Sequence, residues 1–132
     1  MANLTITTVH TVQVQQQVTL PASVAIAQGQ YIIEDTNGKW AIGNATTQGN
    51  VGRRAAIATK AVDAGMPLTG LVKGVMDVGN ALSALAFDAQ VFLSDTVGGV
   101  LADTAGTVSK VVGTVRPAWG ATAADKLLFV DL

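Results

Sequence analysis

Residues 30–47 read Gln-Tyr-Ile-Ile-Glu-Asp-Thr-Asn-Gly-Lys-Trp-Ala-Ile-Gly-Asn-Ala-Thr-Thr, and residues 90–107 read Gln-Val-Phe-Leu-Ser-Asp-Thr-Val-Gly-Gly-Val-Leu-Ala-Asp-Thr-Ala-Gly-Thr. The second stretch begins 60 residues after the first, and six positions are identical at this offset. The identical pairs are Gln30/Gln90, Asp35/Asp95, Thr36/Thr96, Gly38/Gly98, Ala45/Ala105 and Thr47/Thr107. Self-similarity at a fixed spacing predicts two copies of one supersecondary unit.

Each copy is expected to form a β-hairpin, over residues 30–42 and 90–102. In the first copy Asn-Gly lies between two apolar runs, which is the strongest short signal for a hairpin. In both turns we expect the Asp side chain to cap the turn and the Gly to take a positive φ. The predicted turn residues are therefore Asp35, Gly38, Asp95 and Gly98.

The rest of the chain shows short apolar runs separated by turn signals, which is typical of a small sandwich or barrel. Further strands are expected at 54–62, 71–77, 108–116 and 126–131. A short helix could lie within 77–89, and 43–52 is expected to be an exposed loop. The sequence therefore predicts an all-β fold, a small β-barrel or sandwich with internal duplication. A single β domain over 21–132 would consist of two similar halves, about 22–79 and 80–132.

The N-terminal stretch alternates between apolar and polar residues over positions 4–20. Such a period of two places the apolar residues on one face of an extended chain. Seventeen residues would reach roughly 55 Å, which is longer than an ordinary strand. This leaves two interpretations, two successive strands or an extended arm over 1–20 that leaves its own domain. We expect the arm to contact a neighbouring chain, and proline to end it at Pro21. The contact residues would be Leu4, Ile6, Val12, Gln13, Val14, Gln15 and Gln17.

The composition of the 132 residues is poor in charge, with 13% charged and 49% apolar residues and a net charge of −1. A typical domain has about 25% charged residues, so partner chains are expected to cover much of the surface, although a Thr/Gln/Asn surface is an alternative explanation. The balanced charge predicts no general attraction to nucleic acid. Without cysteine there is no disulfide. Neither an apolar run of about 20 residues nor a signal peptide is present, so no membrane association is expected.

Candidate catalytic residues are scarce, because His10 is the only histidine and Glu34 the only glutamate. We therefore expect no enzyme activity, no metal, no cofactor and no small-molecule substrate. The repeated Asp-Thr-x-Gly is similar to the paired Asp-Thr-Gly of aspartic proteases, in which two carboxylates share a proton. A capped turn is the favoured interpretation, because the flanking residues resemble strands.

Basic residues at Arg53 and Arg54, together with Lys60, Lys73 and Arg116, could form a strip. Nucleic-acid binding would call for interleaved aromatic residues, and these are few. We therefore expect Arg53 and Arg54 to be solvated or to pair at an interface. Trp40 and Trp119 occupy corresponding places in the two copies, where core packing is favoured over an intersubunit contact.

Three segments together carry a resemblance to a known family. They are Leu-Val-Lys-Gly-Val-Met-Asp-Val at 71–78, Ala-Leu-Ala-Phe-Asp-Ala-Gln-Val-Phe-Leu-Ser at 84–94, and Val-Val-Gly-Thr-Val at 111–115. In pattern and composition, roughly residues 55–132 resemble the small capsid decoration (cement) proteins of tailed bacteriophages, which are short, cysteine-poor, all-β chains. The N-terminal stretch and the Asn-rich first copy depart from the simplest members.

The resemblance implies a structural virion protein that is made in the host cytoplasm and located on the outer capsid surface. It implies the major capsid protein as partner, clamping of neighbouring capsid subunits, and a homotrimer. An extended arm would suit strand addition to a neighbour's sheet. The alternatives are a host-surface or glycan-binding module of a phage fibre or adhesin, an enzyme that uses Asp35 and Asp95, and a tail-tube or connector protein.

Overall fold

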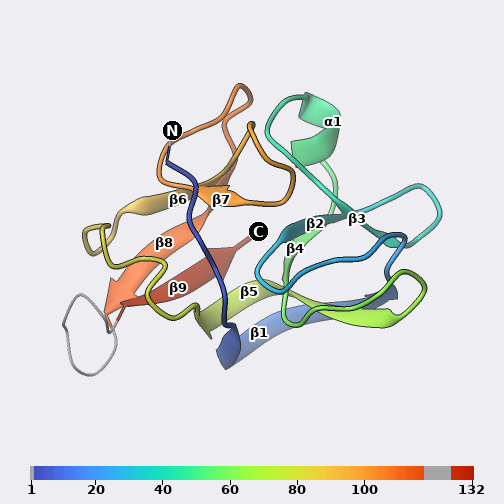
Figure 1. Ribbon diagram of the computed structural model, residues 1–132, viewed down its shortest axis with the longest axis horizontal. Helices are drawn as coiled ribbons and strands as arrows, with labels where there is room; N and C mark the ends of the chain where they lie inside the picture. The colour runs from blue at the N-terminus through green and yellow to red at the C-terminus, as the bar shows by residue number, and fades with distance from the viewer. Residues whose placement is uncertain (1, 118–125) are drawn as a thin grey trace.

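The computed structural model describes residues 2–117 and 126–132. They form nine strands and one four-residue helix, all in one continuous antiparallel sheet apart from the helix (Figure 1). The elements are β1 (His10–Pro21), β2 (Tyr31–Glu34), β3 (Trp40–Ile42), α1 (Gln48–Val51), β4 (Ala55–Ala58), β5 (Pro67–Asp77), β6 (Gln90–Leu93), β7 (Leu101–Ala102), β8 (Val111–Pro117) and β9 (Lys126–Asp131). The predicted all-β class is confirmed, with the sheet curled into a half-barrel.

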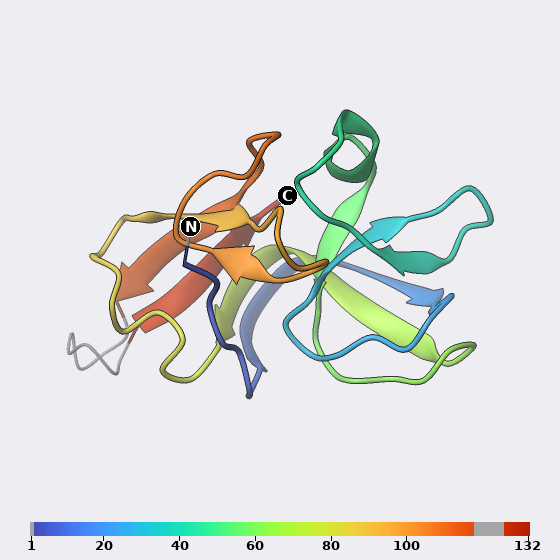
Figure 2. The same ribbon diagram turned by 45° about the horizontal axis from the view of Figure 1, so that its top comes forward.

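The two halves of the sheet have the same arrangement of strands. The strand order is β3-β2-β4-β5-β9-β8-β6-β7, with β1 paired to β5 off this path. On each side a hairpin is followed by one strand and then by a strand of the central pair. Figures 1 and 2 show β2, β3 and β4 gathered on one side of the molecule and β6, β7, β8 and β9 on the other. β5 and β9 join the two sides through antiparallel pairing from Lys73↔Asp131 to Met76↔Leu128.

Both predicted hairpins are present. β2 pairs with β3 from Ile32↔Ile42 to Glu34↔Trp40, and β6 pairs with β7 through Phe92↔Ala102 and Leu93↔Leu101. In the first turn Gly38 has a φ of +73°, and the Asp35 carboxylate accepts hydrogen bonds from the backbone N–H groups of Asn37 (2.8 Å) and Lys39 (2.9 Å). Here the expected side-chain cap and the expected positive φ are confirmed.

The second turn differs from the prediction in two respects. The positive φ falls on Gly99 (+76°) and not on Gly98, so that prediction is wrong. The hydroxyl of Ser94 accepts from the backbone N–H of Thr96 at 3.1 Å, while the Asp95 carboxylate leaves the turn and accepts from the backbone N–H and the hydroxyl of Thr107. The second turn has Gly99 where the first has Lys39, and Gly99 takes the left-handed conformation in place of Gly98.

Backbone hydrogen bonds also join the two sides away from β5 and β9. The N–H of Tyr31 donates to the carbonyl of Gly99 at 2.8 Å, and the N–H of Gly99 donates to the carbonyl of Gly43 at 2.7 Å. Gly99 is required at this crossing, because a Cβ there would lie 2.9 Å from Cγ2 of Ile42. The repeated hairpins therefore contact each other through the turn of the second copy.

Two groups of buried side chains form the core. The larger spans both sides of the molecule, and the smaller surrounds Trp40 between β1, β2, β4 and β5. The Trp40 side chain is fully buried, and its Nε1–H donates to the carbonyl of Leu68 at 2.9 Å. Core packing is thus confirmed for Trp40, whereas Trp119 lies outside the described residues.

Several element boundaries correct the sequence-based expectation. β4 is only four residues long, and residues 78–89 form turns with no helix. The one helix, α1, lies within 43–52, where an exposed loop was expected. Its sequence Gln-Gly-Asn-Val gives no helical hydrophobic pattern, so it could not be predicted from periodicity.

The N-terminal stretch folds on its own chain, in two extended segments. β1 pairs with β5 over its full length and ends at Pro21, as expected. Before it, the N–H of Leu4 donates to the carbonyl of Leu101 at 2.8 Å. The interpretation of 1–20 as an arm that leaves its own domain is therefore wrong for the backbone, because both segments find sheet partners within the chain.

Candidate functional site

β1 is an edge strand, and it lies along the lower border of the molecule in Figure 1. Its strand partner among the described residues is β5, in a register that runs from His10↔Asp77 to Pro21↔Pro67. β5 pairs on its other side with β4 and β9. The outer edge of β1 thus presents backbone N–H and C=O groups to the surroundings, which is the geometry that accepts an added strand.

The side chains of β1 are exposed on both faces over most of the strand. Every residue of 10–17 is exposed. Val18 and Leu20 are partly buried, because they pack against the smaller core group around Trp40. Val12 and Val14 are each 46% exposed. Exposed large apolar side chains on an edge strand are unusual in a protein that has no partner.

The register between β1 and β5 is irregular at three places: between Thr11 and Gln13, between Val14 and Gln16, and between Gln16 and Gln17. Gly74 of β5 lies opposite Val14 with a φ of +151°. A Cβ on Gly74 would collide with the carbonyl oxygen of Gln13. The glycine therefore permits the close approach of the bulged strand.

The charge pattern around β1 is the feature that most distinguishes it from an ordinary edge. Residues 2–33 contain no Asp, Glu, Lys or Arg, and His10 is the only ionisable side chain in the strand. Edge strands are commonly protected by charged residues, especially Lys. β1 carries Thr and Gln instead, so only its bulges limit pairing with another strand.

Two further apolar side chains are exposed beyond the C-terminal end of the strand, at the other end of β1 from Val12 and Val14. The N–H of Ala22 donates to the carbonyl of Met66 at 2.9 Å, which places Met66 beside the end of β1. The side chains of Met66 and Val24 are 54% and 45% exposed. We call Val12, Val14, Val24 and Met66 the β1 apolar surface. The sequence analysis missed Val24 and Met66, because isolated apolar residues in loops give no periodic signal.

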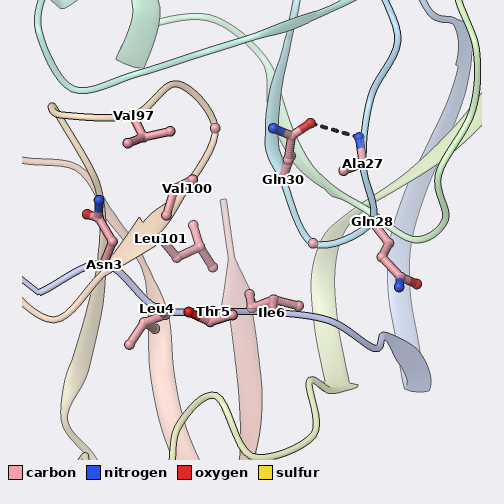
Figure 3. A pocket seen from close by; sticks show the side chains of 12 residues that line it. Asn3, Leu4, Thr5, Ile6, Ala27, Gln28, Gln30, Val97, Val100 and Leu101 are labelled. Carbon is pink, nitrogen blue, oxygen red and sulfur yellow. Dashed lines mark hydrogen bonds between the residues drawn. The ribbon is translucent and has the colours of Figure 1, made fainter.

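Leu4 and Ile6 lie elsewhere, in the first extended segment, and both are partly buried against the larger core group. Figure 3 shows them in one wall of a cavity of about 400 Å³, opposite the 27–30 turn and residues 97–101. Ile6 packs directly on Gly29, where a Cβ would lie 2.6 Å from Cγ2 of Ile6. The structure therefore gives these two residues an intramolecular role.

The cavity in Figure 3 is lined by uncharged residues only. The Gln30 side-chain carbonyl accepts from the backbone N–H of Ala27 at 2.8 Å, and the Gln28 amide donates to the carbonyl of Thr7. These bonds hold the 27–30 turn against the N-terminal segment. The cavity brings together residues from both sides of the sheet, but its amides are engaged in the fold.

Arg53 and Arg54 directly precede β4 and contact Glu34 at the end of β2, and in the strand order β1-β5-β4-β2 both of these strands are separated from β1 by β5. Nη2 of Arg54 forms an ion pair with Oε2 of Glu34 at 2.9 Å, and Nη1 of Arg53 donates to the carbonyl of Glu34 at 3.4 Å. Arg116 pairs with Asp88 and Lys73 lies 4.0 Å from Asp131. The cations thus pair with acids at separate places, and Arg53 and Arg54 do not join the β1 residues in one site.

The carboxylates of the repeated Asp-Thr motif are held by different segments. A backbone hydrogen bond from Lys39 is the largest cause that keeps the pKa of Asp35 below its ordinary value. For Asp95 the hydroxyl of Thr107 has this role and lowers the pKa. If the two carboxylates shared a proton, one of the two pKa values would be raised. The hydrogen bonds therefore favour a structural role, in which Asp35 holds its turn and Asp95 holds the loop at Thr107.

Two buried hydroxyl groups, on Tyr31 and Thr114, have no hydrogen-bond partner among the residues that the structure describes. Burial raises the pKa of Tyr31 to about 12.

In the described ranges 2–117 and 126–132, no three His, Cys, Asp or Glu side chains gather into a group that could hold a metal ion. Within the same ranges, no helix has the length and apolar character needed to cross a membrane.

Comparison with known proteins adds no identification. No protein-family model matches the chain, and no curated protein matches it significantly. The uncharged, exposed β1 strand with its apolar surface is therefore the principal structural guide to function.

Proposed function

We propose that this protein is a structural protein of a bacteriophage virion. It binds in many copies to the outer surface of the assembled capsid and stabilises the shell by clamping neighbouring major capsid subunits. The observation that carries the proposal is β1, an edge strand without charged residues whose Val12 and Val14 side chains are exposed. The resemblance of residues 55–132 to capsid decoration proteins supplies the identity of the partner.

The chemistry of the β1 apolar surface favours a protein partner. Exposed apolar side chains bind other proteins through burial, with little help from charge. Three of the basic residues considered for a nucleic-acid strip are instead paired with acids, Arg54 with Glu34, Arg116 with Asp88 and Lys73 with Asp131. A protein surface with matching apolar side chains is the partner that suits these features best.

Clamping requires no turnover. A protein that binds only the assembled state shifts the equilibrium toward that state by mass action. When many copies bind one particle, and each contacts two subunits, modest contacts add to a strong total effect. On this proposal the protein is made in the host cytoplasm and ends on the outer surface of the virion, and the resemblance implies that it acts as a homotrimer.

The host-surface or glycan-binding alternative has less support in the described residues. Sugar-binding platforms use exposed aromatic rings, whereas the Trp40 and Tyr31 side chains are fully buried. Phe87 is 40% exposed, but the ammonium of Lys126 covers its ring at 5.2 Å from the centroid.

The test is co-sedimentation of purified protein with undecorated heads over a range of ionic strengths. We expect binding to persist at raised salt, because a chain with eight basic and nine acidic residues has little long-range attraction to screen. Heads that already carry a decoration protein are the control and should bind little. Absence of co-sedimentation at any salt, together with tight binding to a glycan or turnover of a substrate, would replace this proposal.

A further inference from the structure

We infer that the outer edge of β1 pairs with β1 of a second copy of this chain, antiparallel, about a two-fold axis at Gln15. This inference concerns the chain alone and does not rest on the capsid proposal. It explains why a long strand with two exposed faces carries neither charge nor a second strand partner within the described residues.

The sequence of β1 is nearly the same in both directions. Residues 11–19 read Thr-Val-Gln-Val-Gln-Gln-Gln-Val-Thr, and their centre is Gln15. In an antiparallel pairing about this centre, identical residues face each other at every position except 14 and 16, where Val14 faces Gln16. The matched pairs are Thr11 with Thr19, Val12 with Val18, Gln13 with Gln17, and Gln15 with itself.

Such pairs suit a strand that meets its own copy. Directly opposed Thr–Thr and β-branched pairs stabilise antiparallel strands, and like charges would oppose the pairing. A Gln amide carries both donors and acceptors, so two Gln side chains can satisfy each other. Because 11–19 contains no ionisable side chain, two copies meet without repulsion.

The centre of the palindrome also falls at the middle of the strand, which runs from His10 to Pro21. The pairing would therefore use the strand to both ends, with His10 opposite Leu20. The next pair outward would place Val9 opposite Pro21, and proline has no N–H to donate. Proline thus sets a natural end to the pairing on both sides of the axis.

A two-fold contact closes on itself. Once two β1 edges are paired, neither copy has a free β1 edge to recruit a third. The assembly formed by this contact is a dimer, in contrast to the homotrimer that the family resemblance implies.

Cross-linking tests the register directly, because the chain contains no cysteine. In the variant Gln15→Cys the two thiols lie opposite each other at the axis, so mild oxidation should yield a disulfide-linked dimer. Gln48→Cys is the matched control, because Gln48 is also exposed but lies in α1. Equal cross-linking of both variants would count against the proposed axis.

Charge variants test the pairing by sedimentation velocity over a range of protein concentrations. We expect the unmodified chain to form a dimer. Since Gln13 faces Gln17 of the other copy, Gln13→Lys/Gln17→Lys places like charges opposite each other and should raise the dissociation constant at least ten-fold, whereas Gln13→Lys/Gln17→Glu places opposite charges there and should keep the dimer. Gln48→Lys should have no effect, and circular dichroism confirms folding of each variant.

Two results would overturn the inference. One is a chain that remains monomeric at all concentrations; if its β1 variants then fail to bind shells, the edge pairs with a strand of a different protein. The other is a dimer or trimer that survives Gln13→Lys/Gln17→Lys unchanged, which would place the contact between copies on another surface.

Discussion

Gly74 of β5 lies directly beneath the Gln13 carbonyl of β1, so close that a Cβ on Gly74 would collide with that oxygen. The glycine also has a φ of +151°, a conformation that other residues resist. These two facts mean that the docking of β1 depends on the absence of a single side chain in β5. The strand that carries the proposed function is therefore tied to one backbone position.

We expect Gly74→Ala to destabilise the protein by roughly 1–3 kcal/mol, because strain and a backbone collision act together. Urea unfolding gives the free energy, and amide hydrogen exchange should show faster exchange at the β1 amides that bond to β5. Gly49→Ala in α1 is the control, since nothing lies within 4 Å of a Cβ at Gly49. Equal stability of the two variants would contradict the close approach of β1.

Gly99 and Gly98 are adjacent, yet they should respond differently to substitution. Gly99 has the positive φ and lies against both Ile42 and Gln30, whereas a Cβ on Gly98 would meet only Ile42 at 3.3 Å. We expect Gly99→Ala to cost at least about 1 kcal/mol more than Gly98→Ala. Thermal or urea unfolding measures the difference. A larger cost at Gly98 would mean that the left-handed residue of the turn is misplaced.

Gly38 offers a comparison with the first turn. It shares the positive φ (+73°), but no atom lies within 4 Å of a Cβ there. Gly38→Ala should therefore show the conformational cost alone, of about 1 kcal/mol, and a smaller loss than Gly99→Ala. A cost at Gly38 equal to or above that at Gly99 would rule out a contribution from Ile42 and Gln30.

The two hairpins of the repeated stretches are the part of the fold that was best predicted from the sequence. Apolar runs around a turn with Asp and Gly defined both hairpins, because strand pairing and turn chemistry act within a few residues. The strand at 126–131 was found for the same reason. By contrast, the identity of residues at an offset of 60 misplaced the positive φ, because the second turn has Gly99 where the first has Lys39, and Gly99 can take the left-handed conformation.

Alternation predicted the exposed strand of the candidate site, but not the whole set of residues around it. It identified β1, including Val12, Val14 and the glutamines Gln13, Gln15 and Gln17. It could not show that Leu4 and Ile6 bend back onto Leu101 and Gly29, because those contacts join residues far apart in sequence. Nor does any local pattern reveal that Glu34 neutralises Arg54.

Asp95 should make the stability of the protein depend on pH in the acid range. The hydrogen bonds from Thr107 lower its pKa in the folded state below the ordinary value of 3.8. A lowered folded pKa contributes stability above the unfolded pKa, and this contribution is lost as pH falls through the folded pKa. We therefore expect the urea concentration at the unfolding midpoint to decrease as the pH is lowered below about 4. Asp95→Asn should reduce this dependence on pH. An identical pH profile in the variant would show that Thr107 does not hold the carboxylate.

Tyr31 and Trp40 are both fully buried, but only one of them has a satisfied polar group. The Tyr31 hydroxyl has no hydrogen-bond partner, so Tyr31→Phe should leave stability unchanged or raise it by up to about 1 kcal/mol. Trp40→Phe leaves the Leu68 carbonyl without its donor and opens space, and should cost roughly 2–4 kcal/mol. Both values come from urea unfolding. A large loss on Tyr31→Phe would indicate that the hydroxyl is hydrogen-bonded after all.

Ile6 and Val14 both belong to the alternating N-terminal stretch, yet substitutions at the two positions should affect different properties, stability at Ile6 and binding to heads at Val14. Ile6 is partly buried on Gly29 and in the larger core group, so Ile6→Ala should cost about 1–2 kcal/mol and leave binding to undecorated heads unchanged once the variant is folded. Val14 is 46% exposed, so Val14→Ala should change stability by no more than about 0.5 kcal/mol and weaken co-sedimentation with heads. Urea unfolding and the sedimentation assay, applied to the same two preparations, provide both readouts. If Val14→Ala binds heads as well as the unmodified chain while Ile6→Ala loses binding, then the shell contact lies near the cavity of Figure 3 and not on the β1 apolar surface.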